Sequence, residues 1–183
     1  MNHPEQILRT LDRHLVRPTR LILYGRAALA LGFSNPSPEF HATMDVDAIL
    51  PEIEMSSIEA DDSFWNAIEK TNEELHATGL YLTHLFTDAQ VILQPDWLEN
   101  LSAIELNGLS TLELFRPSTA DLILTKMMRV DPQDREDIHF LLAQLQPTSA
   151  TIHHIIENAV VPDLLEIRDA FISNSTWLRE QIS

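Results

Sequence analysis

The spacing of apolar and polar residues predicts that helices and strands alternate along the first two thirds of the chain. Apolar side chains recur at helical spacing over residues 4–16, and the next run, RPTRLILYG, is typical of a short buried strand that ends at Gly25. A helix over RAALALGF is expected to follow directly. Residues 61–78 again show helical spacing, and Asp61, Asp62 and Ser63 at their beginning are candidate capping residues.

The rest of the pattern predicts more strands and then a helical end. The segments GLYLTHLF and QVIL are expected to form strands around the turn TDA, and PDWLENL to form a short helix with proline in its first turn. Residues 112–115 are expected to form a last strand. Four helices should close the chain, near residues 118–130, 131–145, 149–159 and 162–181.

The most informative segment is TMDVDAIL, which follows a loop rich in Ser, Pro and Asn. Its apolar residues Met44, Val46 and Ala48 alternate with Asp45 and Asp47, which is the period of a strand with its apolar side toward the core. The two carboxylates then leave the same face about 7 Å apart along the strand, close enough to share divalent cations. An exposed edge strand with a solvated acidic face is the alternative for this motif taken alone.

Composition is that of a globular protein with a core. The chain has 183 residues, of which 44% are apolar, and it contains no cysteine, so disulfides and thiolate metal sites are excluded. Its start is polar and amphipathic rather than like a signal peptide, and no run approaches the roughly 20 apolar residues of a membrane span. We therefore expect a cytoplasmic protein without a membrane partner.

Charge is distributed unevenly along the chain, whose formal net charge is -16. Residues 1–30 carry a net charge of +3, residues 31–115 carry 16 acids against Lys70 alone, and residues 116–183 carry a net charge of -4. Such an acidic middle repels phosphate backbones and argues against an extended nucleic-acid footprint. A small anionic ligand that arrives with magnesium remains compatible with it.

Two motifs resemble a known family, the minimal nucleotidyltransferases of the DNA polymerase beta superfamily. Their signature is a strand, a Gly-Gly or Gly-Ser turn that opens a helix, and an Asp-x-Asp strand about 20 residues later, often preceded by Arg-x-Thr. The corresponding segments here are Leu21 to Tyr24, Gly25-Arg26, and Ala42-Thr43-Met44-Asp45-Val46-Asp47. Further along, Lys126 followed by Asp134 to Asp137 resembles the helix-turn-helix of nucleotidyltransferase-fold proteins of toxin-antitoxin and abortive-infection type.

This resemblance implies an α/β (α+β) fold, with a nucleotidyltransferase-type mixed sheet flanked by helices and a C-terminal helical extension. Residues 1–116 would form the core, and residues 117–183 the helical region packed on it. Asp45 and Asp47 would be catalytic ligands of Mg²⁺ or Mn²⁺. Gly25 would be the phosphate-loop glycine, with Arg26 and Thr43 also binding the nucleotide.

The resemblance also gives roles to the C-terminal motif. Lys126 would contact the nucleotide phosphates, and Asp137 would orient Lys126 or an acceptor hydroxyl. Lys126 and Arg129 lie three residues apart, so on one helical face they can present two cations to a triphosphate. The alternative is that these cations form structural salt bridges with Asp134 and Asp137 across the turn.

The implied activity is transfer of a nucleoside monophosphate from a magnesium-bound nucleoside triphosphate to a hydroxyl of a small molecule or protein, with release of pyrophosphate. Two departures favour an alternative, a catalytically impaired nucleotide-binding or protein-interaction module such as a toxin-antitoxin component with a protein partner. Arg26 replaces the second small residue of the turn, and a third carboxylate is not evident on the later strand. That strand offers His84 instead, so the general base is unassigned.

Overall fold

The computed structural model describes residues 1–182 and divides into two compact units. The first unit combines Met1–Thr87 with Leu101–Arg116. The second combines Asp88–Asn100 with the chain from Pro117 on. Each unit is built around its own buried side chains, and the segment Asp88–Asn100 belongs with the second although it interrupts the first.

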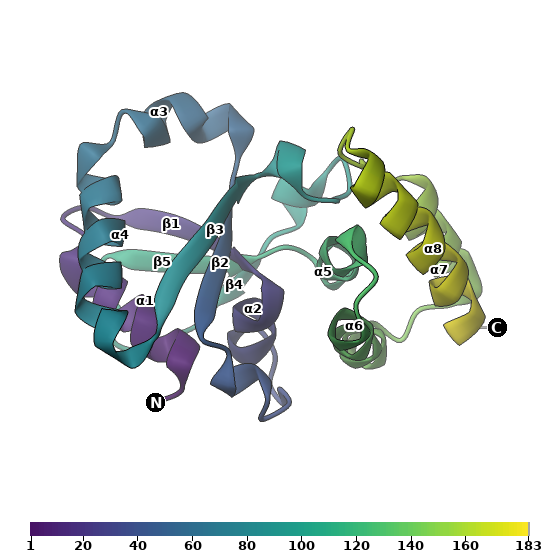
Figure 1. The fold of residues 1–183 in the computed structure, drawn as a ribbon, viewed down its shortest axis with the longest axis horizontal. Coiled ribbons are helices and arrows are strands. Elements are labelled where there is room, and N and C mark those ends of the chain that lie inside the picture. Colours follow the sequence, from purple (N-terminus) through teal and green to yellow (C-terminus); the bar gives the residue numbers. More distant parts are fainter. Residues whose placement is uncertain (183) are drawn as a thin grey trace. The chain divides into compact units, whose positions relative to one another are not determined.

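The first unit is built on one five-stranded mixed sheet with the strand order β3-β2-β1-β5-β4 (Figure 1). The central strand β1 pairs antiparallel with β2 and parallel with β5. The edge strand β3 runs parallel to β2, whereas β4 runs antiparallel to β5. The strands are β1 (Thr19–Tyr24), β2 (Asp45–Leu50), β3 (Tyr81–Thr87), β4 (Ser102–Ile104) and β5 (Leu112–Arg116).

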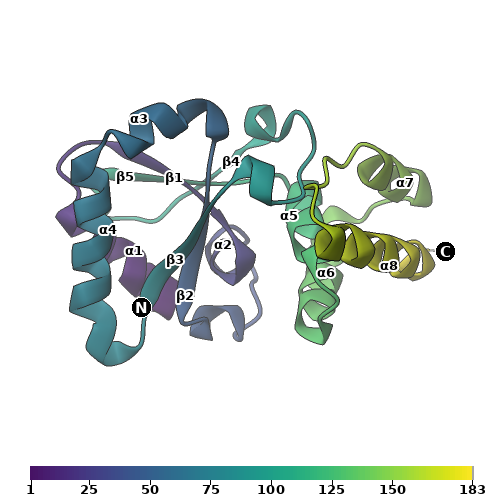
Figure 2. The same cartoon turned by 45° about the horizontal axis from the view of Figure 1, so that its top comes forward.

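Helices α1 and α4 pack against each other beside this sheet, and α2 continues directly from β1 (Figures 1 and 2). The apolar stripe of α1, which includes Ile7, Leu8 and Leu11, is fully buried. Asp61 caps α4 by accepting hydrogen bonds from the backbone N–H groups of Ser63 and Phe64, so the predicted cap is confirmed. The helices of this unit are α1 (His3–His14), α2 (Gly25–Leu31), α3 (Met55–Glu59) and α4 (Asp62–Leu75).

A buried carboxylate ties α1 to the beginning of β5. Asp12 is 7% exposed and accepts hydrogen bonds from the backbone N–H groups of Ser110, Thr111 and Leu112 at 2.7–3.2 Å. The Ser110 hydroxyl donates a further one at 3.1 Å. Burial raises the pKa of Asp12, but these four donors together outweigh it, so the pKa lies below its ordinary value.

The second unit is helical and includes the Asp88–Asn100 segment. Ser118 caps α5 by accepting a hydrogen bond from the backbone N–H of Asp121, and Asp131 caps α6 by accepting one from that of Gln133. The buried Asp121 carboxylate accepts a 2.7 Å hydrogen bond from the backbone N–H of Gln94, which fixes the segment to α5. The helices are α5 (Thr119–Thr125), α6 (Pro132–Leu145), α7 (Ser149–Glu157) and α8 (Leu165–Gln181).

Three local predictions were wrong. The segment QVIL forms no strand, and its Leu93 makes only an isolated bridge to Val160 in the second unit. The short strand β4 was not foreseen, and Met44 lies outside β2 with 40% of its surface exposed rather than toward the core. A run of only three apolar residues, Val91 to Leu93, fits a strand or another buried segment equally well, and only the partner segment decides between them.

The predicted fold class is confirmed: the protein is a mixed α/β (α+β) structure with a five-stranded mixed sheet and flanking helices. The predicted division of the chain into a core over residues 1–116 and a C-terminal helical region over residues 117–183 stays a prediction. Within residues 1–182, every helix is too short or too polar to cross a lipid bilayer.

Candidate functional site

Asp45 and Asp47 leave one face of β2, as the alternating pattern predicted. Val46 and Ala48, which alternate with them, are fully buried on the opposite face, whereas both carboxylates are only half-buried. The Thr43 hydroxyl donates a 2.8 Å hydrogen bond to Oδ1 of Asp45 and fixes its orientation. The pair is therefore held toward solvent by a strand whose other face is anchored in the core.

A third side chain, His84, joins the two aspartates through a bulge in the neighbouring strand. Asp47 pairs with Thr83 and Ala48 pairs with Leu85, so His84 is the extra residue between them. Its φ of 45° lies in the left-handed region, which is uncommon for residues other than glycine. The bulge directs the imidazole to Asp47, with 3.0 Å between Nδ1 and Oδ1.

Asp45, Asp47 and His84 together offer a compact set of metal-binding atoms. One ligand atom from each lies within 4.8 Å of the other two. Ligands around one cation at ~2.0–2.2 Å stand up to about 4.4 Å apart, so small side-chain adjustments suffice for all three to bind the same ion. Two carboxylates and one imidazole also match the charge and donor chemistry of a divalent cation.

Gly25 lies directly beside this cluster at the start of α2. Its φ is +65°, and a Cβ at this position would stand 2.9 Å from Oδ2 of Asp47. Only glycine combines this backbone conformation with so close an approach to the carboxylate. Gly25 of the predicted turn is therefore within contact distance of Asp47 in the Asp-x-Asp motif.

Aromatic rings border the same face of the sheet. Tyr24 pairs with Asp47 across β1 and β2, and its ring centroid lies 6.4 Å from that of Phe86. The Phe86 ring is in turn 5.4 Å from the His84 ring. The aromatic residues Tyr24 and Phe86 therefore lie next to members of the cluster, on the same two pairs of strands.

A family described as nucleotidyltransferase of unknown function (DUF6036) matches residues 5–160. The chain belongs to this family. The matched residues include the whole first unit except its first four residues, together with α5, α6 and α7. No curated protein and no solved structure matches the chain. The predicted membership in a poorly characterised branch of nucleotidyltransferases is thus confirmed.

The other predicted nucleotidyltransferase residues of the first unit lie nearby in the chain but contact different groups. The Arg26 guanidinium stands over the Phe40 ring at 5.5 Å from the centroid, an arrangement of the cation–π type. Thr43 contacts Asp45, as described. Their predicted binding of a nucleotide stays a prediction.

Lys126 and Asp137 lie in the second unit, in a buried ion-pair cluster that links the end of α5 to α6. Lys126 Nζ is 2.7 Å from Asp137 Oδ2 and 3.1 Å from Asp134 Oδ1, and all three residues are at most 9% exposed. Arg129 Nε is 2.5 Å from Asp134 Oδ2. The salt bridges considered as an alternative are thus present, while phosphate contact by these cations stays a prediction.

The expected placement of Lys126 and Arg129 on one helical face is wrong. α5 ends at Thr125, Lys126 begins a single 3₁₀ turn, and Arg129 already has extended backbone. As a result the lysine is buried while the arginine side chain is 67% exposed. The hydrogen bond to Asp134 is the largest cause that raises the pKa of Arg129, which keeps it charged.

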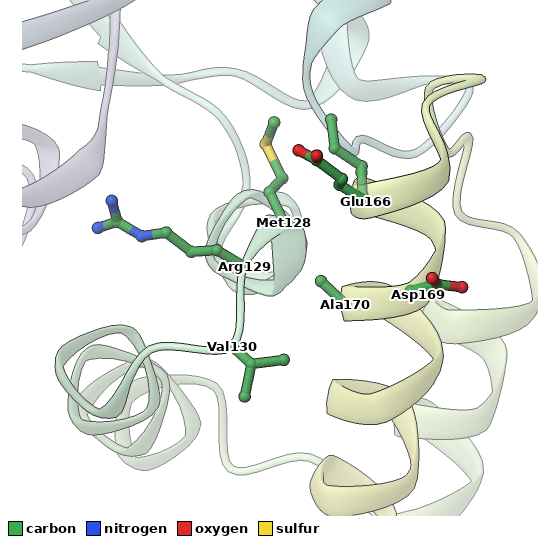
Figure 3. Close-up of a pocket in the computed structure, with 7 residues that line it drawn as sticks. Met128, Arg129, Val130, Glu166, Asp169 and Ala170 are labelled. Atoms are coloured by element: carbon green, nitrogen blue, oxygen red, sulfur yellow. The ribbon is translucent and has the colours of Figure 1, made fainter.

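The second unit also contains an open groove between residues 128–130, which follow α5, and the beginning of α8 (Figure 3). Figure 3 shows the Arg129 side chain pointing away from Glu166 and Asp169 of α8. Apolar and acidic side chains dominate its lining, which does not suit a phosphate. The groove is lined by Met128, Arg129, Val130, Glu166, Ile167, Asp169 and Ala170.

His84 is the site residue for which the sequence motifs predicted no role. Its position on the strand was visible in GLYLTHLF, where an acid was expected, but nothing local indicates a bulge. In a regular strand, residue 84 would pair with Ala48 and face the core with it. Only the shift in register brings the imidazole to the aspartates.

Proposed function

We propose that the protein transfers a nucleoside monophosphate from a metal-bound nucleoside triphosphate to a hydroxyl group. In this reaction the hydroxyl oxygen bonds to the α-phosphorus, the bond to the β-phosphate oxygen breaks, pyrophosphate leaves with that electron pair, and the hydroxyl gives up its proton. The observation that carries the proposal is the convergence of Asp45, Asp47 and His84 on one face beside Gly25. Membership in a nucleotidyltransferase family supports it.

Electrostatics explain why the nucleotide would need a cation. The cluster contains two carboxylates within a stretch of the chain that carries 16 acids and one lysine, so it repels a free triphosphate. A divalent ion, when bound, supplies the positive charge that neutralises the triphosphate and the developing charge on the leaving group. Asp45 and Asp47 would hold this ion, while Thr43 fixes the orientation of Asp45.

The remaining nucleotide contacts follow from the chemistry of the side chains and from the resemblance to minimal nucleotidyltransferases. Gly25, whose backbone lies against Asp47, would bring its N–H group to the phosphates, and Arg26 would supply a guanidinium next to it. We also propose phosphate contacts for Lys126 and Arg129, with Asp137 as the positioning residue of Lys126 through their 2.7 Å hydrogen bond.

The acceptor is best sought among small molecules and proteins. An extended nucleic acid would bring a row of phosphates against a chain whose residues 31–115 carry 16 acids and one lysine, which repels them. A hydroxyl on a small molecule or on a protein side chain avoids this repulsion. A protein partner that covers part of the acidic surface would be basic for the same reason.

Calorimetric titration with ATP, GTP, CTP and UTP, in Mg²⁺ and in Mn²⁺, tests the nucleotide site. We expect cation-dependent binding by the wild-type protein and its loss in the Asp45→Asn/Asp47→Asn double variant. Asp62→Asn is the matched control, because Asp62 is an exposed acid on α4. No binding of any nucleotide by the wild-type protein would overturn the proposal.

Transfer itself is tested with α-labelled nucleotides and a cell extract as the source of acceptors. Label should appear on an acceptor with wild-type protein and with Asp62→Asn, and not with the double variant. Cation-dependent binding without any transfer would instead favour a catalytically impaired nucleotide-binding module, such as a toxin-antitoxin component.

A further inference from the structure

One of the three potential ligand atoms in the candidate metal site is a nitrogen, and the type of ligand atom affects which cation the site prefers. Mg²⁺ is a hard cation that favours oxygen ligands and gives up its water reluctantly, whereas imidazole nitrogen suits divalent transition metals. Asp45 and Asp47 supply oxygen, and His84 supplies a ring nitrogen within 4.8 Å of both carboxylates. A set of two oxygens and one nitrogen therefore favours a cation that accepts both donor types.

We propose that His84 is a metal ligand and that the site prefers Mn²⁺, or a divalent transition metal of similar chemistry, to Mg²⁺. The proposal rests on the proposed function, because it concerns the cation of the same site. Two carboxylates balance the charge of the ion, and a neutral imidazole adds a third bond without adding charge. Three protein ligands leave the other positions of a six-coordinate ion for phosphate oxygens and water.

The bulge in β3 places the His84 imidazole next to Asp47. Without the bulge, His84 would lie on the face of the sheet where Ala48 is fully buried. With it, the ring projects to Asp47 and its side chain keeps 54% of its surface exposed. A left-handed conformation is unfavourable for residues other than glycine, so holding the ring here reduces the stability of the fold.

A competing role for His84 is that of a hydrogen-bond partner that only orients Asp47. The 3.0 Å contact between Nδ1 and Oδ1 is compatible with that role as well. The two roles differ in one observable: only a ligand transfers spin density from a bound paramagnetic ion to its nitrogen. The test must therefore detect nitrogen on the metal, in addition to measuring affinity.

Pulsed electron paramagnetic resonance of the Mn²⁺-loaded full chain provides this observable. We expect a ¹⁴N coupling from a directly bound imidazole in the wild-type protein and its loss in His84→Asn. Asparagine is chosen because it tolerates positive φ, so the bulge can persist. His153→Asn, at an exposed position on α7, is the matched control and should keep the coupling.

Competition between cations tests the preference. The ratio of the Kd for Mg²⁺ to the Kd for Mn²⁺, measured without nucleotide, should fall by at least about tenfold in His84→Asp. This variant supplies a third carboxylate in place of the imidazole, and aspartate also tolerates the positive φ of residue 84. The ratio is used because an added negative charge tightens the binding of both cations.

The outcomes separate this inference from the proposed function. A bound Mn²⁺ without ¹⁴N coupling, or an unchanged Kd ratio in His84→Asp, would overturn the inference even if nucleotide transfer proceeds. Conversely, a ¹⁴N coupling together with the expected change in ratio supports the inference even if no nucleotide is ever transferred. Failure of the wild-type protein to bind Mn²⁺ at all would overturn both.

Discussion

The backbone of Gly25 lies against the carboxylate of Asp47, so closely that a methyl group on Gly25 would stand 2.9 Å from Oδ2. The glycine that follows β1 and opens α2 is thus matched to the acid of the neighbouring strand β2. Any side chain at residue 25 must displace a carboxylate of the candidate metal site or move the turn before α2. Gly25→Ala, the smallest substitution at this position, therefore tests whether the close approach to Asp47 matters for the candidate metal site.

We expect Gly25→Ala to weaken both the fold and the metal site. The φ of +65° makes any L side chain cost about 1–2 kcal/mol, and the new methyl group pushes Asp47 from its place. Gly79→Ala is a control with the same backbone penalty, since Gly79 has φ +71° but its Cβ would meet only Met44 at 3.5 Å. Denaturation should show losses in both variants, whereas Mn²⁺ affinity should fall only in Gly25→Ala.

Removal of the buried lysine should destabilise the second unit strongly. Lys126→Met leaves the carboxylates of Asp134 and Asp137 buried without their shared cation, which costs about 3–5 kcal/mol. Arg129→Met removes a largely exposed cation and should cost no more than about 1 kcal/mol. Urea denaturation of both variants measures their free energies of unfolding. Equal decreases in the two variants would contradict the larger stabilising role of Lys126.

The same cluster allows a test of phosphate binding by Lys126 that does not depend on stability. Lys126→Met/Asp137→Leu removes one buried charge of each sign, so we expect it to be more stable than Lys126→Met alone. If Lys126 contacts the triphosphate, this folded double variant binds nucleotide more weakly than the wild-type protein by calorimetry. Unchanged affinity would leave Lys126 with a structural role only.

Asp12 should make folding weaken in acid. Its pKa is lower in the folded state than the ordinary value of 3.8, so its stabilising contribution is complete above that value and is lost as the pH falls through the folded pKa. Asp12→Asn should cost about 1–3 kcal/mol at pH 7, because an amide cannot accept all four hydrogen bonds. Urea midpoints of the two proteins should converge as the pH falls below 3.8.

Asp121 should behave in the opposite way. Burial is the largest cause that raises its pKa, against the hydrogen bonds from Ser118 and Gln94, so its contribution is largest below the ordinary value of 3.8 and is lost as the pH rises through the folded pKa. Asp121→Asn keeps an acceptor for Gln94 without a buried charge. We expect its free energy of unfolding to exceed or equal that of the wild-type protein at pH 7, and a large loss would argue against this.

Local sequence determined the parts of the structure that depend on neighbouring residues. Alternation along β2 placed Asp45 and Asp47 on one face, because successive side chains of a strand point to opposite sides. Asp61, Ser118 and Asp131 cap their helices because a short polar side chain can reach the free N–H groups of its own first turn. These arrangements need no distant partner.

Tertiary structure alone decided which segments meet. Strand β5 pairs with β1, and the QVIL segment belongs to the second unit. Which segments meet depends on the free-energy cost of closing the loops between them and on the surface that they bury together. The burial of Lys126 follows likewise from the packing of α5 against α6. The sequence by itself therefore determined the aspartate pair, while the register shift in β3 decided that His84 completes the site, since a bulge is a property of two paired strands.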